Sequence, residues 1–117
     1  MARKTERGAS GTSFHNTVLK CSVNDLIAIF GEPTREDNTG VDKVNFEWIC
    51  ETEEGDVFTV YDWKEYRSIS KTETIEWHIG GMGSRVTERA LTEILNLVIS
   101  FLRSSYTLLP SGPSGIR

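Results

Sequence analysis

The feature that most constrains the fold of this chain is an alternation of apolar and polar residues from Val44 to Trp63, broken once by Glu53-Glu54-Gly55. A period of two is typical of a β-strand with one buried face, so the alternation predicts two strands joined by a tight turn. A two-residue turn would force Glu54 into positive φ, which residues other than glycine and asparagine resist. We therefore predict a three-residue loop in which Gly55 alone adopts that conformation.

The length of this loop sets the register of the hairpin and decides which side chains share a face. Counted outward from the loop, the predicted cross-strand pairs are Thr52 with Asp56, Cys50 with Phe58, and Trp48 with Val60. The predicted core face then consists of Val44, Phe46, Trp48, Cys50, Phe58 and Val60. A third strand extends this face, because Ile75, Trp77 and Ile79 alternate with polar residues.

Aromatic and polar side chains gather on the opposite face of the predicted sheet. Its members are Asn45, Glu47, Ile49, Glu51, Val57, Thr59, Tyr61, Trp63, Glu76 and His78. Aromatic rings beside polar groups on an exposed surface are typical of a site that binds a planar ligand or another protein. Strands also favour tyrosine and tryptophan for structural reasons alone, so a plain solvent-facing surface stays the alternative.

A short helix is predicted before the hairpin. The hydroxyl of Ser22 can cap its first turn while Asp25, three residues later, reaches back to the Ser22 amide. The helix should end at Gly31, which adopts the left-handed conformation at low cost, and Pro33 prevents its continuation. The segment from Thr34 to Lys43 is charged and rich in turn-forming residues, so we predict a mobile loop there.

A longer helix, from about Thr87 to Arg103, should cover the core face of the sheet with its apolar stripe. Leu97 and Ile99 lie outside that stripe, and a helix that is apolar beyond one face often meets a second surface. This pattern predicts a homo-oligomer.

The 117 residues, 38% of them hydrophobic, suffice for one domain with one core. We predict a flexible N-terminal arm over residues 1–12, a single α+β domain over residues 13–103, and a flexible or partner-docking tail over residues 104–117. The expected element order is β-α-β-β-β-α, with an antiparallel sheet of three to four strands covered on one face by helices.

Charge and composition argue against several classes of function. Between Glu32 and Asp62 there are ten carboxylates against only Arg35 and Lys43, so this segment should repel a nucleic-acid polymer. No stretch is apolar enough to cross a membrane, and the absence of an apolar leader predicts a reduced cytosolic setting. Neither histidine lies in a spacing typical of metal ligands. His78 with Glu47 or Glu76 could perform acid–base chemistry if a pocket desolvated them, but the sequence shows no such cleft. We therefore predict no metal, no cofactor and no enzymatic activity.

Two resemblances add to this interpretation. The order helix, Gly31-Glu32-Pro33 and strand meander resembles the helix-G-x-P-sheet module of the lipoprotein BamE and the β-lactamase inhibitory proteins, which are binding domains. The segments 42–48 (DKVNFEW), 61–67 (YDWKEYR) and 76–81 (EWHIGG) are similar to small orphan proteins of tailed bacteriophages, over residues 12 to 100. The second resemblance implies a viral protein in the host cytoplasm that acts by binding.

Phage proteins of this size commonly antagonise host antiviral defence, so the resemblance implies sequestration of a nucleotide immune signal. In that interpretation aromatic rings stack on a base while basic groups and the glycine-rich segment 80–83 hold phosphates. The predicted ligand-binding residues are Tyr61, Trp63, Lys64, Tyr66, Arg67, His78 and Arg85. The alternative is an inhibitor that blocks a host defence protein directly through the acidic and aromatic sheet face.

Overall fold

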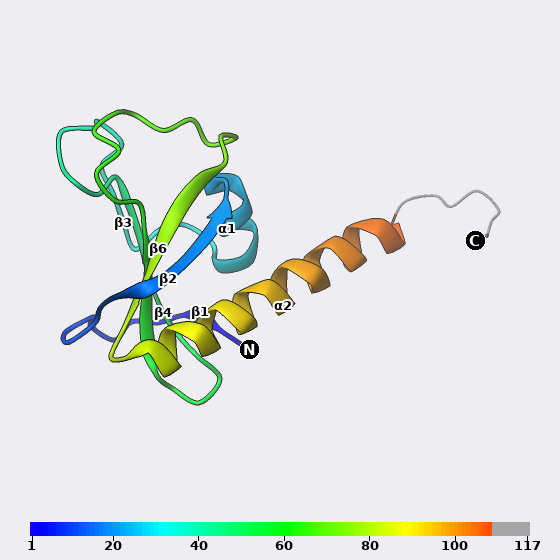
Figure 1. Cartoon of the computed structure of the whole chain (residues 1–117). Helices are drawn as coiled ribbons and strands as arrows, with labels where there is room; N and C mark the ends of the chain where they lie inside the picture. Colours follow the sequence, from blue (N-terminus) through cyan, green and yellow to red (C-terminus); the bar gives the residue numbers. More distant parts are fainter. Residues whose placement is uncertain (109–117) are drawn as a thin grey trace.

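A computed structural model describes residues 1–108, with residues 104–108 described by their backbone alone. The chain forms a six-stranded antiparallel sheet and two helices (Figure 1), so the predicted α+β class is confirmed. The elements are β1 (Arg3–Lys4), β2 (Ser13–Cys21), α1 (Val23–Phe30), β3 (Arg35–Glu36), β4 (Phe46–Glu51), β5 (Val57–Tyr61), β6 (Ile75–Gly81) and α2 (Ser84–Leu108). The sheet order is β1-β4-β5-β6-β2, and β3 also pairs with β4.

The hairpin between β4 and β5 has the predicted register, with Cys50 opposite Phe58 and Trp48 opposite Val60. Its loop is closed by two hydrogen bonds of 2.9 Å, in which the Thr52 amide donates to the Asp56 carbonyl and the Gly55 amide donates to the Thr52 carbonyl. Gly55 has a φ of 95°, as expected for the residue that takes the left-handed conformation. The predicted three-residue loop is therefore confirmed.

The core lies between one face of this sheet and the two helices. Fully buried side chains from three central strands are Phe46, Trp48, Cys50, Phe58, Val60, Trp77 and Ile79. The indole rings of Trp48 and Trp77 meet edge to face with their centroids 5.6 Å apart. Helix α2 crosses β2 and β6 on this side, and its Ala90 and Ile94 are fully buried there. The predicted core face is confirmed, although Val44 at its end is only half-buried.

Helix α1 is capped as predicted. The Ser22 hydroxyl accepts from the Asp25 amide at 3.1 Å, and the Asp25 carboxylate accepts from the Ser22 amide at 2.9 Å. The helix ends at Gly31, whose carbonyl accepts from the indole nitrogen of Trp48 at 2.9 Å. This bond ties the end of α1 to the centre of the sheet.

The N-terminal residues differ from the predicted arm. Arg3–Lys4 forms the edge strand β1, and Ala2 is buried. The Arg3 guanidinium lies 2.6 Å from the Glu51 carboxylate on β4. The acidic edge of β4 therefore attracts a basic segment that has almost nothing apolar to bury. Strand β3 likewise adds structure within the segment that the sequence predicted to be a mobile loop, and the sheet gains two strands beyond the predicted number.

The C-terminal elements begin and end at other residues than predicted. Gly80 and Gly81 belong to β6 and not to a turn, because they pair with Thr59 and Phe58 of β5. A Cβ on Gly80 would lie 2.6 Å from the Thr59 hydroxyl, so glycine permits this close approach of the strands. Helix α2 begins at Ser84 and continues to Leu108, so it includes the first part of the predicted tail. Residues 109–117 of that tail lie outside the described residues.

Candidate functional site

Four rings from three strands or their ends meet on the sheet face that is turned away from the helices. We call Phe14, Tyr61, Trp63 and His78 the aromatic face. His78 is its centre, because its ring centroid lies 3.9 Å from that of Phe14, 5.5 Å from that of Tyr61 and 6.2 Å from that of Trp63. The surface is partly accessible, with Trp63 40% exposed.

Sheet register explains how these rings come together. Tyr61 on β5 lies directly opposite His78 on β6, as alternation along both strands requires. Phe14 reaches His78 because the pairing of β2 with β6 shifts register between Phe14 and Val18, where Asn16 has a φ of 67°. Such irregularities re-aim side chains at the edge of a sheet. The sequence offered no signal for this contact, which depends on the bulge.

Trp63 is held in place by a buried carboxylate. Asp62 is fully buried, and its Oδ1 accepts from the backbone amides of Asn45 at 2.9 Å and Phe46 at 2.8 Å. The Asn45 side chain in turn donates to the Arg67 carbonyl at 2.8 Å. These bonds join the loop before β4 to the loop after β5, so Trp63 projects from an anchored segment.

A groove with a volume of about 680 Å³ lies beside Trp63. Its lining residues are Arg35, Glu36, Asp37, Asp42, Lys43, Val44, Asn45, Glu47 and Trp63. This set contains four carboxylates and two cations, and one of the cations, Arg35, is ion-paired with Glu47. The groove therefore has an excess of negative charge.

The exposed indole of Trp63 already attracts cations from its own chain. The Lys43 ammonium lies 5.8 Å from the ring centroid, and the Lys64 ammonium lies 5.5 Å from it. Both distances are within the range of a cation–π interaction. The ring and the neighbouring carboxylates thus favour the same kind of group, a cation.

Burial changes the acid–base properties of two members of the aromatic face. Desolvation lowers the pKa of His78 below its usual value of 6.5, and the nearby Glu76 charge opposes this only in part. Desolvation, followed by the Glu47 charge, raises the pKa of Tyr61. At neutral pH both groups are therefore uncharged, and they act as hydrophobic rings with polar edges.

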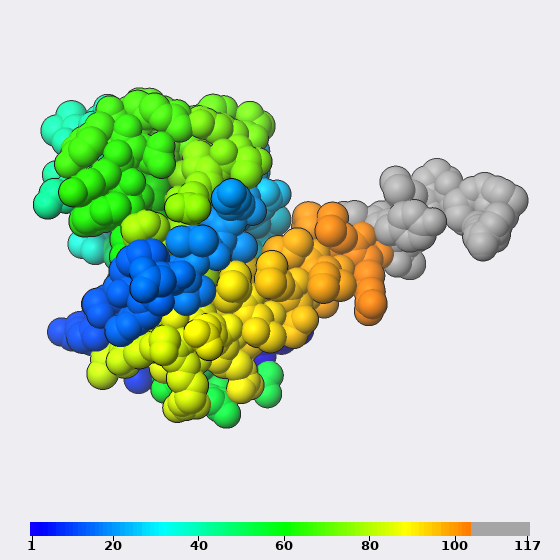
Figure 2. All heavy atoms as spheres, viewed as in Figure 1, coloured from blue at the N-terminus to red at the C-terminus, as the bar shows by residue number. Residues whose placement is uncertain are grey.

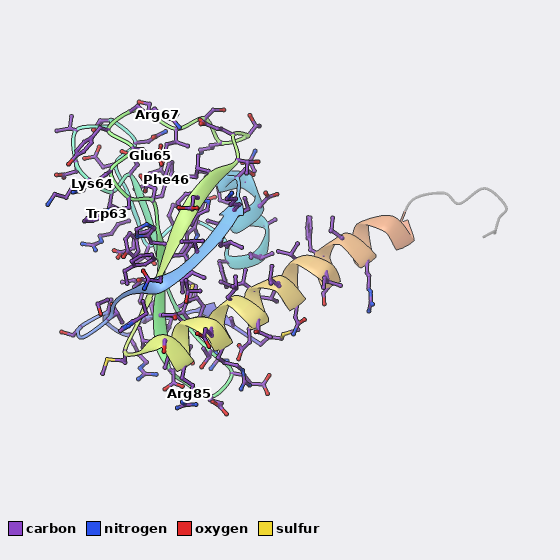
Figure 3. The ribbon with its side chains drawn as sticks, in the orientation of Figure 1. Phe46, Trp63, Lys64, Glu65, Arg67 and Arg85 are labelled. Carbon is purple, nitrogen blue, oxygen red and sulfur yellow. The ribbon has the colours of Figure 1, made fainter. Side chains whose placement is uncertain are left out.

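The seven predicted ligand-binding residues do not form one cluster. Tyr61, Trp63, Lys64 and His78 lie together, whereas Arg67, Tyr66 and Arg85 are separate from them. The Arg67 guanidinium donates to the Glu73 carboxylate at 2.9 Å and also pairs with Glu65 at 3.2 Å. Tyr66 is exposed and makes none of the ring contacts of the aromatic face. Figure 3 shows Arg85 at the opposite end of the molecule from Trp63 and Lys64.

Sequence reasoning missed Phe14 and most of the residues that line the groove. Asp37, Asp42 and Lys43 were predicted to lie in a mobile loop, and only the acidic composition of the surrounding segment indicated a recognition role. Within residues 1–103, no group of three or more histidine, cysteine, aspartate or glutamate side chains is arranged to hold a metal ion. None of the helices found over residues 1–108 is long and apolar enough to span a membrane.

Comparison with known proteins adds no assignment, because no family model, no curated protein and no solved structure matches this chain. The features that bear on function are the geometry of the aromatic face and of the groove beside it.

Proposed function

We propose that this protein acts by binding, and that the aromatic face with its acidic groove receives a basic segment of a partner protein. The observation that carries the proposal is the half-exposed Trp63 ring, which contacts two lysines of its own chain at the border of a groove with four carboxylates and two cations. An arginine or lysine side chain of a partner would replace these lysines on the ring and approach the carboxylates.

The nucleotide alternative has less support from the same geometry. Phosphate oxygens would meet the carboxylates of Glu36, Asp37 and Asp42 at the groove. Of the basic groups expected to hold them, Arg67 is committed to Glu73 and Arg85 is remote from Trp63. Lys43 and Lys64 lie beside the Trp63 ring, and Arg35 in the same groove is ion-paired with Glu47.

A catalytic role for His78 also has little support. Its imidazole contacts three other rings, and no carboxylate hydrogen-bonds to it within the part of the chain whose side chains are described. A general base needs such an orienting partner and a free edge directed at substrate. We infer that His78 is a binding residue.

The similarity of three sequence segments to phage orphan proteins supports a biological context for this binding. On that basis we propose that the partner is a host defence protein and that the bound protein is blocked in the host cytoplasm. A basic surface of such a partner, for example one that contacts nucleic acid, would be complementary to the groove.

A calorimetric titration of the full chain tests the kind of ligand. The probes are an arginine-rich peptide, a glutamate-rich peptide of equal length and a cyclic dinucleotide. We expect saturable binding of the arginine-rich peptide alone, weakened about tenfold or more by Trp63→Ala because a cation–π contact and an aromatic anchor are lost. Saturable binding of the dinucleotide without binding of the peptide would favour sequestration of a nucleotide signal and overturn the proposal.

A matched pair of charge variants tests whether the groove is the site. D37N/D42N removes two carboxylates from the groove, and E6Q/E88Q removes two exposed carboxylates outside it. We expect the first variant to weaken peptide binding about 3- to 10-fold at low salt, and the second to change it little. Equal losses in both would mean that net charge alone attracts the peptide, which contradicts a specific groove.

A further inference from the structure

The C-terminal half of α2 carries apolar side chains beyond the core of its own domain. Up to Arg103, the buried residues of the helix are Val86, Thr87, Ala90, Glu93 and Ile94, and Leu97 and Val98 are partly buried against the core. Further along, large apolar side chains are about half exposed, namely Leu95 (46%), Ile99 (48%), Phe101 (47%) and Leu102 (59%). Figure 2 shows this part of the helix, in orange, emerging from the body of the domain.

The projecting helix also makes the molecule longer than its size requires. The radius of gyration is 15.5 Å, whereas about 13 Å is expected for a compact domain of this length. A soluble domain rarely leaves a row of large apolar side chains on an element that stands away from its core. Such a row is typical of a surface that another molecule covers.

The spacing of the apolar side chains indicates what kind of element covers them. Leu91, Leu95, Val98 and Leu102, which we call the α2 seam, follow one another at intervals of four, three and four residues. Leu91 and Val98 are half-buried against the core of their own domain, whereas Leu95 and Leu102 are exposed. This is the a/d spacing of a helix that packs along another helix. Ile99 and Phe101 flank the seam at the adjoining e and g positions and widen it. A second helix is therefore the expected occupant.

Charge restricts the chemistry of that helix. The nine residues from Ile94 to Leu102 include no charged side chain, so the seam has nothing to attract a charged partner. The rest of the helix up to Arg103 has mixed charges, and Arg89 is ion-paired with Glu93. An anionic membrane surface would require a large excess of lysine and arginine on the polar face, whereas this helix has three arginines against two glutamates. The complementary surface is an uncharged helical seam of the same spacing.

We propose that two copies of this chain associate through α2, with the seam of each copy packed against the seam of the other. A second α2 has the required spacing and lack of charge, and a two-fold symmetric dimer buries the seams of both copies. The four half-exposed side chains offer on the order of 400 Å² of apolar surface per copy, which is less than a typical stable interface buries. The dimer is therefore reversible and dissociates on dilution.

Sedimentation equilibrium of the full chain over a wide range of concentration tests the proposal. We expect a monomer–dimer equilibrium for the natural sequence and a monomer at every concentration for L95E/L102E. The matched control is N96E/S100E, which places the same two charges on exposed positions of the same helix outside the seam. This control should dimerise about as well as the natural sequence, and it excludes a general effect of charge.

Folding is checked by the fluorescence of Trp48 and Trp77, which are fully buried, whereas Leu95 and Leu102 are exposed. If the double variant fails to fold, Leu102→Glu alone replaces the most exposed seam residue and should weaken the dimer at least tenfold. A monomeric natural sequence, or a dimer unaffected by L95E/L102E, would overturn the proposal. So would a monomer that cosediments with phosphatidylcholine–phosphatidylglycerol vesicles through Leu95 and Leu102, which would identify a membrane surface as the occupant.

Discussion

The buried carboxylate of Asp62 shows how a single side chain prepares the candidate site. It accepts hydrogen bonds from two backbone amides, at Asn45 and Phe46. Burial raises the pKa of Asp62, and these hydrogen bonds oppose the shift. The next residue is Trp63. The hydrogen bonds of the buried Asp62 carboxylate therefore hold the exposed ring in position. A sequence pattern cannot reveal such a bond between residues 17 positions apart.

His78 should make stability depend on pH. Its pKa is lowered in the folded state by burial, so the unfolded chain binds a proton more readily than the folded chain. The contribution of His78 to the free energy of unfolding is therefore fully present above about pH 6.5. It decreases as the pH falls from 6.5 toward the pKa of His78 in the folded state. Thermal unfolding of the natural sequence and of His78→Phe, measured at several pH values, isolates this contribution.

The phenylalanine variant keeps a ring in contact with Phe14 and Trp63 but cannot titrate. The control is His15→Phe, which changes the other histidine, whose ring nitrogen lies 3.2 Å from the Ser13 hydroxyl. We expect the acid-induced loss of stability below pH 6.5 to be smaller in His78→Phe than in the natural sequence. An NMR titration in which His78 has a pKa above 6.5 would contradict the expected sign.

Among the elements, β6 shows how glycine shapes the sheet. A Cβ on Gly80 would lie 2.6 Å from the Thr59 hydroxyl and 3.5 Å from the Tyr61 ring. Gly80→Ala should therefore destabilise the fold by about 1–3 kcal/mol, because a buried side chain must move to admit the methyl group. Denaturant unfolding followed by tryptophan fluorescence measures the change.

Gly8→Ala is the matched control for this substitution. A Cβ at Gly8 has no heavy atom within 4 Å, and φ at this residue is not positive. Its stability should change by less than about 0.5 kcal/mol. Equal effects of the two substitutions would mean that the close approach of β5 and β6 does not require glycine at position 80.

Helix α2 is an element with two environments. Its first half is fixed to the domain through buried Ala90 and Ile94 and through Glu93, whose carboxylate accepts from the Glu53 amide at 3.0 Å. Its second half offers the α2 seam to another copy. Sequence periodicity identified the helix and its excess of apolar residues, but the point at which the domain stops covering it depends on where the sheet ends.

At the scale of the whole molecule, Cys50 reports on the integrity of the core. It is fully buried, and burial raises its pKa to about 12. The reactive thiolate is therefore scarce and inaccessible in the folded chain. We expect Cys50 to react with iodoacetamide only through unfolding, so that its labelling rate follows global stability across a denaturant series.

Cys21 provides the internal comparison. It is half-buried at the end of β2, and burial raises its pKa to about 12 as well. Peptide mapping separates the two sites, and Cys21 should label at least as fast as Cys50 in native buffer. Rapid labelling of Cys50 without denaturant would show that the sheet opens locally beside β1, and would contradict a single cooperative core.

The sequence by itself determined the local features of this protein. The register of the β4–β5 hairpin follows from Gly55 and the alternation around it, and the start of α1 follows from Ser22 and Asp25. Each depends on residues that are neighbours along the chain, so conformational preferences and periodicity are sufficient to predict them. The composition of the core face follows from the same alternation.

Only the tertiary structure decided the composition of the candidate site. It placed Phe14 on His78 through an irregular strand, engaged Arg67 with Glu73, and left Arg85 at the far end of the molecule. It also paired the basic N-terminal residues with the acidic edge of β4. The physical reason is that these arrangements arise between segments distant in the sequence, where packing and charge complementarity select partners that local preference does not distinguish.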